Sequence, residues 1–146
     1  AYAARLLKPM IDRSTRRFRI EARLPPPRAR GDFRKLTQVV VNILENSFQS
    51  LPDPDAAVIL QVFRQDGRAI IECRDEGCGM DESVASRIFE PFFTTKSEAG
   101  GTGLGMPVAQ GIVKDHGGEI TIQSAPDRGT TVRVSLPAME GEEAME

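Results

Sequence analysis

The sequence predicts an α+β fold, a two-layer sandwich in which helices cover one face of a mixed, mostly antiparallel sheet. Two observations lead to this prediction. Short strand-like runs occur at five places, and apolar residues recur at helical spacing in two longer segments. Their order is strand, long helix, strand pair, long loop, helix and strand pair. With 146 residues and 40% hydrophobic content, the chain is long enough for one ordinary core.

The first predicted strand is FRIEARL (18–24), in which apolar and charged residues alternate until a run of prolines ends it. The longest helix follows from Asp32, which suits the N-cap position, and PDP (52–54) closes it. Its face toward the core is predicted from residues three and four apart. They are Leu36, Val39, Val40, Ile43, Leu44 and Ser47.

The next two strands, 57–63 and 68–74, flank RQDG, whose Asp66-Gly67 pair predicts a tight hairpin. The chain then enters a long loop with at most a short helix near 81–88. Loops of this length inside a compact domain are usually functional or mobile.

A second helix is predicted from Leu104 to His116, with Gly117 as its stop. Leu104, Val108 and Ile112 share one face of it. Two alternating strands, 119–124 and 130–136, complete the fold as a second hairpin.

Composition excludes several classes of protein. A formal charge of −2 with interspersed signs does not suggest a surface for nucleic acid. Cys73 and Cys78 form no CxxC pair and His116 is the single histidine, so we expect neither zinc nor disulfides, which fits a reducing compartment. No apolar run approaches the roughly 18 residues that span a bilayer. Because the chain begins with Ala1, we expect it to be a piece of a longer protein.

The first candidate site is the glycine-rich stretch GGTGLG (100–105), directly before the second long helix. Backbone N–H groups free of side chains, next to a helix N-terminus, attract phosphate. The alternative is a plain glycine linker. No Gly-Lys-Ser/Thr follows, and no buried strand leads into the turn, so neither a Walker A loop nor a dinucleotide fingerprint is matched.

The second candidate is a pair of asparagines on the long helix. Asn42 and Asn46 lie four residues apart, with Gln38, Glu45 and Gln49 on the same polar half. Asparagine is a poor helix former, and two carboxamides on one face can supply oxygen atoms to Mg²⁺. The alternative is an ordinary solvated face.

The third candidate is Asp75, at the end of a predicted strand and followed by Gly77 and Gly79. Its carboxylate can accept a hydrogen bond from an exocyclic amine, while the glycines leave space for a flat ring. Taken alone, an Asp-x-Gly-x-Gly turn would be uninformative.

In their order along the chain, these motifs resemble the catalytic ATP-binding domain of sensor histidine kinases. The match covers residues 30–137, and its F box is most similar to the nitrogen-regulation branch of the GHKL superfamily. The five boxes are NILENS (42–47, N), DEGCGM (75–80, G1), FEPFFTTK (89–96, F), GTGLGM (101–106, G2) and GTTVRVSLP (129–137, G3). The resemblance implies a Bergerat fold that binds ATP beneath a lid.

The resemblance also implies roles for the residues of the G1 and G3 boxes. Asp75 would accept from the adenine amino group, with Thr130 assisting it, and Gly77 and Gly79 would give the base room. Met80 would pack near the ring.

For the N box, the resemblance implies that Asn46 coordinates Mg²⁺ and that Asn42 assists with the metal or the phosphates. Glu45 would orient or deprotonate the histidine that receives phosphate; the alternative, on helical spacing, is a Glu45 that faces solvent. Gln49 stands where many relatives carry a basic residue that reaches phosphate, so that contact is in doubt.

Residues 89–105 would form the ATP lid, with the backbone of Gly101, Gly103 and Gly105 around the phosphates. Phe92 and Phe93 would anchor the lid or meet partner helices. Lys96 is a candidate phosphate contact, the alternative being a solvated lysine. Thr102 and Leu104 complete the implied nucleotide-binding set.

The phosphoacceptor histidine of such kinases lies on an upstream helical hairpin, whose motif is absent here. We therefore expect residues 1–29 to be the connection from that hairpin plus the first strand, 30–137 the catalytic domain, and 138–146 a disordered acidic tail. His116 is interpreted as structural.

The resemblance implies ATP and ADP as ligands and, as partners, the dimerisation and phosphotransfer domain of the parent and, through it, a response regulator. We expect no contact with nucleic acid or membrane, a cytoplasmic location, and a monomeric piece of a homodimeric parent.

Two alternatives remain. One is a degenerate ATP-sensing pseudokinase module that acts by protein contacts, against which the intact asparagines and glycines argue. The other is a serine kinase or ATPase of the same superfamily; its hydrolysing members usually carry a glutamate where Asn42 stands.

Overall fold

The computed structural model describes residues 2–23, 27–93 and 103–139. Their strands form one five-stranded sheet in the order β1-β2-β3-β5-β4. β1 pairs with β2 in parallel, and the other neighbours are antiparallel. The strands are β1 (Phe18–Ala22), β2 (Val58–Gln65), β3 (Arg68–Asp75), β4 (Glu119–Ser124) and β5 (Thr130–Pro137).

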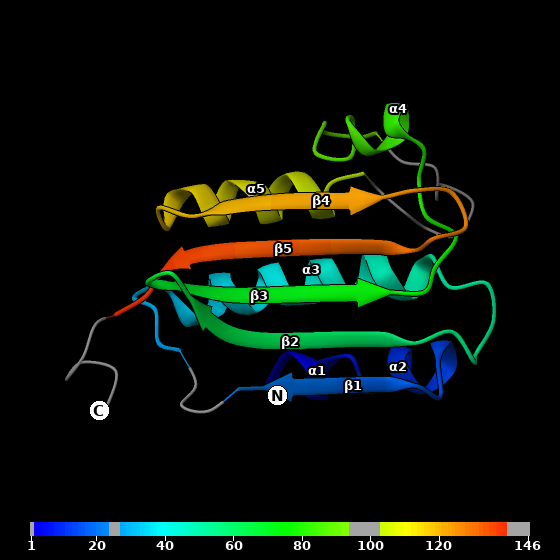
Figure 1. Cartoon of the computed structure of the whole chain (residues 1–146), viewed down its shortest axis with the longest axis horizontal. Coiled ribbons are helices and arrows are strands. Elements are labelled where there is room, and N and C mark those ends of the chain that lie inside the picture. Colours follow the sequence, from blue (N-terminus) through cyan, green and yellow to red (C-terminus); the bar gives the residue numbers. More distant parts are fainter. Residues whose placement is uncertain (1, 24–26, 94–102, 140–146) are drawn as a thin grey trace.

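Two long helices, α3 (Phe33–Gln49) and α5 (Gly105–Asp115), lie side by side on one face of this sheet (Figure 1). Two short helices, α1 (Tyr2–Leu6) and α2 (Lys8–Ser14), pack beside α3. The one-turn helix α4 (Glu82–Ala85) lies beyond β4, at the sheet edge. The predicted two-layer α+β architecture is therefore confirmed.

The long helix forms where the sequence predicts it. Asp32 caps it, since its Oδ1 accepts hydrogen bonds from the backbone N–H groups of Arg34 (2.9 Å) and Lys35 (3.3 Å). Its buried stripe follows the predicted spacing and packs on the sheet. The buried residues are Val39, Ile43, Leu44, Ser47 and Phe48.

The hairpin between β2 and β3 also forms as predicted. Asp66 (φ 53°) and Gly67 (φ 74°) both have positive φ, as a two-residue turn of type I′ requires. The hairpin of β4 and β5 opposes Ser124 to Thr130. Because β3 pairs with β5 and opposes Asp75 to Thr130, the β4–β5 turn lies at the end of the sheet where β3 ends.

The fully buried residues of α5 lie beside the apolar face that Leu104, Val108 and Ile112 share. Met106, Ala109 and Val113 face the core, whereas Leu104 and Val108 are 38% and 44% exposed. Because α5 packs against α3 as well as β4, its core stripe lies where the small Ala109 side chain permits close approach. The helix ends at Asp115, and Gly118 N–H donates to the Val113 carbonyl at 2.9 Å, beside the predicted stop at Gly117.

The two ends of the chain have more structure than the sequence indicated. Residues 2–14 form α1 and α2, which pack on α3. Ala138 makes a bridge to Ala29, and Met139 N–H donates to the Arg28 carbonyl at 2.7 Å. Residues 24 and 140–146, covered by the predicted strand and tail, lie outside the described residues. Within the described ranges, no helix has the length and apolar composition needed to cross a membrane.

The core fills the space between the inner face of the sheet and the helices α3 and α5. Its largest fully buried side chains are Val39, Ile43, Leu44, Ser47, Val58, Cys73, Val113, Val132 and Val134.

Candidate functional site

Asp75, the last residue of β3, is a buried carboxylate at the end of the sheet where α5 begins (Figure 1). Only 4% of it is exposed. It pairs across the sheet with Val58 of β2 and Thr130 of β5, and its Oδ1 accepts a hydrogen bond from Gly77 N–H at 2.9 Å. An ionisable group with so little exposure on the inner side of a sheet is a candidate for binding.

Thr130 is held beside Asp75 by a chain of hydroxyl groups. Its Oγ1 lies 2.8 Å from Ser124 Oγ, which in turn donates to the Gly129 carbonyl at 3.0 Å. Met80 N–H also donates to Ser124 Oγ, at 2.8 Å. Ser124 thus connects the G1 loop to β5. It was not a predicted site residue, although the predicted hairpin already placed it opposite Thr130.

Gly77 and Gly79 make close approaches that no side chain allows. A Cβ at Gly77 would lie 2.7 Å from Asp75 Oδ1 and 2.9 Å from the Ser50 carbonyl oxygen. Gly79 has a φ of 69°, and a Cβ there would lie 1.9 Å from the Ala125 carbonyl oxygen. The backbone from 75 to 80 is therefore packed directly onto neighbouring backbone.

The two long helices meet at the predicted asparagines. Asn42 Nδ2 donates to the Gly105 carbonyl at 2.9 Å, and Gln38 Nε2 donates to Asn42 Oδ1 at 2.5 Å. Gly105 is the first residue of α5, so Asn42 joins the N box to the glycine-rich stretch. Glu45 and Asn46 lie on the next turn of α3 and are half-buried.

The F box begins a segment that returns to the glycine-rich stretch. Phe92 N–H donates to the Gly103 carbonyl at 3.0 Å, and Phe92 is 75% exposed. The half-buried Phe93 ring lies under the Arg87 guanidinium, with 4.3 Å between Arg87 Cζ and the ring centroid. Leu104 occupies the N-cap position of α5. Lys96, Gly101 and Thr102 lie outside the described residues.

Residues 31–140 match the family described as histidine kinase-, DNA gyrase B-, and HSP90-like ATPases. The chain belongs to this family. The match spans all the boxes described above, and its ATPase description agrees with the ATP-binding site that the motifs imply.

Among curated proteins, the chain is similar to histidine kinases. It is 41% identical over 107 residues to the signal transduction histidine-protein kinase AtoS of Escherichia coli, and 39% identical over 108 residues to sporulation kinase A of Bacillus subtilis. Each alignment covers 73% of this chain but 17% of the relative. This chain therefore corresponds to one part of those kinases.

A solved structure agrees with the fold. The mycobacterial sensor histidine kinase MprB superposes with a TM-score of 0.80 at 26% identity, covering 95% of this chain and 95% of that chain. The chain therefore has the fold and sequence of the ATP-binding catalytic domain of a sensor histidine kinase.

The residues present fit a nucleotide with its metal ion. A buried carboxylate stands beside a tight turn in which Gly77 and Gly79 leave no room for a Cβ, and the carboxamides of Asn42 and Asn46 lie on α3. The carboxylate suits the amino edge of adenine, and the carboxamide oxygens suit a divalent cation that is bound to phosphate.

Beneath Asp75, the inner side of the site is apolar and uncharged. Ser47 Oγ lies 3.3 Å from Cys73 Sγ, and both residues are buried. Burial raises the pKa of the Cys73 thiol to about 12, so the thiol stays protonated near neutral pH. The only buried ionisable groups among the described residues are thus Asp75 and this neutral thiol.

His116 uses both ring nitrogens in the domain itself. Its Nε2 accepts from the Asp32 backbone N–H at 3.0 Å, and its Nδ1 lies 2.8 Å from the Ile112 carbonyl oxygen. This imidazole joins the end of α5 to the start of α3. The geometry supports the interpretation of His116 as structural.

Proposed function

We propose that this chain binds ATP with Mg²⁺ and presents the γ-phosphate to a histidine on a separate domain of its parent protein. The observation that carries the proposal is the convergence of the N, G1 and G3 boxes with the end of the G2 box. Asp75 pairs with Thr130, and Asn42 donates to Gly105. Residues from four distant stretches of sequence thereby surround one end of the sheet.

In the proposed complex, Asp75 accepts a hydrogen bond from the adenine amino group. Thr130 supports that carboxylate from the neighbouring strand, and Met80 packs against the ring. Gly77 and Gly79 are proposed to give the base room; in addition, their close contacts with neighbouring atoms fix the turn that follows Asp75. Guanine carries a carbonyl oxygen where adenine carries its amino group. That oxygen would face the Asp75 carboxylate, and because both are hydrogen-bond acceptors, guanine is disfavoured.

The phosphates are proposed to lie between α3 and the start of α5. Asn46 would hold Mg²⁺ with help from Asn42, and Mg²⁺ would neutralise charge on the transferring phosphate. Backbone N–H groups of Gly101, Gly103 and Gly105 would donate to phosphate oxygens. The remaining lid residues proposed to contribute are Phe93, Lys96, Thr102 and Leu104.

The proposed reaction is a phosphoryl transfer in which positioning and charge neutralisation supply most of the catalysis. An imidazole nitrogen of the incoming histidine forms a bond to the γ-phosphorus. The bond from that phosphorus to the bridging oxygen breaks, and ADP leaves with the electron pair. Glu45, next to Asn46 on α3, is proposed to orient the imidazole and take its proton.

We propose that the parent protein is a homodimer, that this domain works in the cytoplasm, and that the phosphohistidine then donates to a response regulator. The relatives support a longer parent protein, because they are histidine kinases several times longer than this chain. The chain alone would bind nucleotide without phosphorylating itself, and we propose that it is monomeric.

The test supplies the missing acceptor. The chain is mixed with γ-labelled ATP, Mg²⁺ and the separately purified histidine-bearing domain of the parent. We expect acid-labile, base-stable label on that domain and none on this chain. Asn46→Ala should slow the transfer by about 10²-fold, because it removes a metal ligand at the developing charge.

Gln123→Ala is the matched control, since it removes an exposed carboxamide from β4, away from α3. Transfer at the wild-type rate by Asn46→Ala would contradict the proposed metal site. Binding of ATP with no transfer would favour the contact-based module, and acid-stable label on serine would favour the serine kinase.

A further inference from the structure

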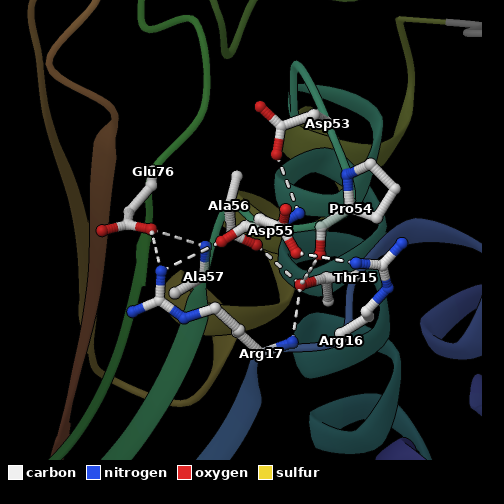
Figure 2. A network of polar contacts seen from close by, with 9 residues as sticks. All are labelled: Thr15, Arg16, Arg17, Asp53, Pro54, Asp55, Ala56, Ala57 and Glu76. Atoms are coloured by element: carbon white, nitrogen blue, oxygen red, sulfur yellow. Dashed lines mark hydrogen bonds and ion pairs between the residues drawn. The ribbon is translucent and has the colours of Figure 1, made fainter.

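Thr15 is a buried hydroxyl where the chain passes from α2 into β1. It is 5% exposed and follows the last residue of α2. Its Oγ1 donates to the Ala56 carbonyl at 2.6 Å, lies 3.3 Å from the Pro54 carbonyl oxygen, and accepts from Arg17 N–H at 2.9 Å (Figure 2). One side chain thus joins the segment entering the sheet to the loop between α3 and β2.

The two arginines after Thr15 hold the same loop from outside. Arg16 N–H donates to the Pro54 carbonyl at 2.8 Å, and its Nη1 contacts Asp55 Oδ1 at 3.0 Å. Arg17 Nη1 donates to the Asp55 carbonyl at 3.0 Å. The ion pair is exposed and contributes little by itself, so the backbone contacts and the Thr15 hydroxyl set the position of the loop.

The other side of the loop is bound to the residue that follows Asp75. Glu76 Oε1 accepts from Ala57 N–H at 2.7 Å, and Glu76 N–H donates to the Ala57 carbonyl at 2.9 Å. Arg17 Nη1 also lies 3.5 Å from Glu76 Oε1. Figure 2 shows that Ala57 and Arg17 both contact the Glu76 carboxylate.

The position of Asp75 therefore depends on this loop. Its successor Glu76 is bound to Ala57, and Cys78 N–H donates to the carbonyl of Ser50, which ends α3. Gly77 N–H, between those two anchors, donates to Asp75 Oδ1. A shift of the loop would move the Ala57 anchor and thus the backbone that orients the carboxylate, whereas the Ser50 anchor belongs to the end of α3.

We propose that Thr15 is a positioning residue for the nucleotide site, acting through loop 53–57 and Glu76 on Asp75. This proposal rests on the proposed function, because it takes Asp75 as the group that binds adenine. Its consequence is a coupling between the segment that enters the sheet and nucleotide affinity. Such coupling is reciprocal, so nucleotide should also stabilise the contacts of Thr15.

The test compares two variants with two controls. Thr15→Val removes the hydroxyl but keeps the side-chain shape, leaving Arg17 N–H and the Ala56 carbonyl without this partner. Glu76→Ala removes the second link at an exposed side chain, so we expect this variant to fold. It tests the proposal if Thr15→Val does not fold. Thr15→Ser restores the hydroxyl, and Thr121→Val makes the matched change at an exposed position of β4.

We expect Thr15→Val and Glu76→Ala to weaken ATP binding by about fivefold or more, whereas Thr15→Ser and Thr121→Val bind as the wild type does. The Gly77 amide resonance should shift in Thr15→Val and stay in place in Thr15→Ser and Thr121→Val. Saturating ATP should slow hydrogen exchange at the Arg17 amide of the wild type, but not of Glu76→Ala.

Wild-type affinity in both Thr15→Val and Glu76→Ala would overturn the proposal and leave the proposed function intact. Failure of the wild type to bind ATP would defeat the proposed function first. In that case the Gly77 amide of Thr15→Val still decides whether Thr15 positions Asp75, because an unchanged resonance in this variant would overturn the positioning role as well.

Discussion

Neighbouring backbone, and not a side chain, limits what position 79 accepts. The Ala125 and Gly129 carbonyl oxygens would lie 1.9 and 3.2 Å from a Cβ at Gly79. Real Cβ atoms do not approach backbone that closely, and the φ of 69° is itself unfavourable for other residues. Position 111 is the opposite case, because a Cβ at Gly111 of α5 would meet nothing within 4 Å.

Gly79→Ala should destabilise the domain by at least about 2 kcal/mol, because both the clash and the φ oppose it. Gly111→Ala should stabilise it by about 0.5–1 kcal/mol, since alanine is the better residue inside a helix. Chemical denaturation of the two variants measures both values. If both variants changed the free energy of unfolding by the same amount, the contacts described for the G1 loop would be contradicted.

At the residue scale, the sequence predicted the residues that form a motif and missed those that support them. Asp75, Gly77 and Gly79 stand together in one short turn, so their relation is visible in the sequence. Thr15 and Glu76 are 61 positions apart and contact the same loop, at Ala56 and Ala57, only in the folded domain, and neither belongs to a periodic pattern. Their roles come from tertiary structure.

At the element scale, the start of α3 and the end of α5 are joined. Asp32 caps α3 with its side chain while its backbone N–H donates to His116 Nε2 at 3.0 Å. Hydrogen bonds from Lys35 N–H and, to a smaller extent, from Arg34 N–H hold the pKa of the Asp32 carboxyl below its usual range. Hydrogen bonds from Val84 N–H and, to a smaller extent, from the Ser83 hydroxyl likewise lower the pKa of the Asp81 carboxyl, at the start of α4.

A lowered carboxyl pKa means that the folded state favours the ionised form. The stabilisation is complete above the unfolded pKa of about 3.9 and is lost as the pH falls through the lower folded value. We therefore expect Asp32→Ala to lower the Tm at pH 7, with the difference from wild type shrinking below about pH 4. Thermal denaturation from pH 3 to pH 7 measures this.

Asp115→Ala is the control for that series, since it removes an exposed carboxylate from the last turn of α5, where it caps nothing. It should not lower the Tm at pH 7. A Tm difference for Asp32→Ala that stays constant down to pH 3 would contradict a cap that depends on charge.

Element types followed from local sequence, but their contacts did not. Spacing in 33–49 and the Asp66-Gly67 turn identified α3 and the first hairpin, because both signals are local. The buried face of α5 depends on packing against α3 and β4 together, which the 104–116 pattern does not contain. The short helices α1 and α2 acquire their partner only in the folded domain.

At the scale of the molecule, one mixed sheet places the site at a single end. β3 ends there with Asp75, β5 begins there with Thr130, and α5 begins there with Gly105 (Figure 1). The long crossover through α3 makes β1 and β2 parallel and carries Asn42 and Asn46 across the inner face. The fold thus gathers motifs that are distant in the sequence.

The order of those motifs made the family recognisable from the sequence. The lid motif illustrates the limit of that recognition, since Lys96, Gly101 and Thr102 lie outside the described residues and their roles stay predictions. The segment at Thr15 illustrates a second limit. The resemblance implies only a connection there, whereas in the structure Thr15 is hydrogen-bonded to loop 53–57.

Calorimetric titration with ATP, with and without Mg²⁺, tests the central claim most directly, comparing the wild-type chain with Asp75→Asn and, as the matched control, Asp66→Asn in the hairpin turn. We predict saturable binding that strengthens with Mg²⁺, a loss of about 10- to 100-fold in Asp75→Asn, and no change in Asp66→Asn. Wild-type affinity in Asp75→Asn, or no binding by the wild-type chain, would contradict the nucleotide site described for this domain.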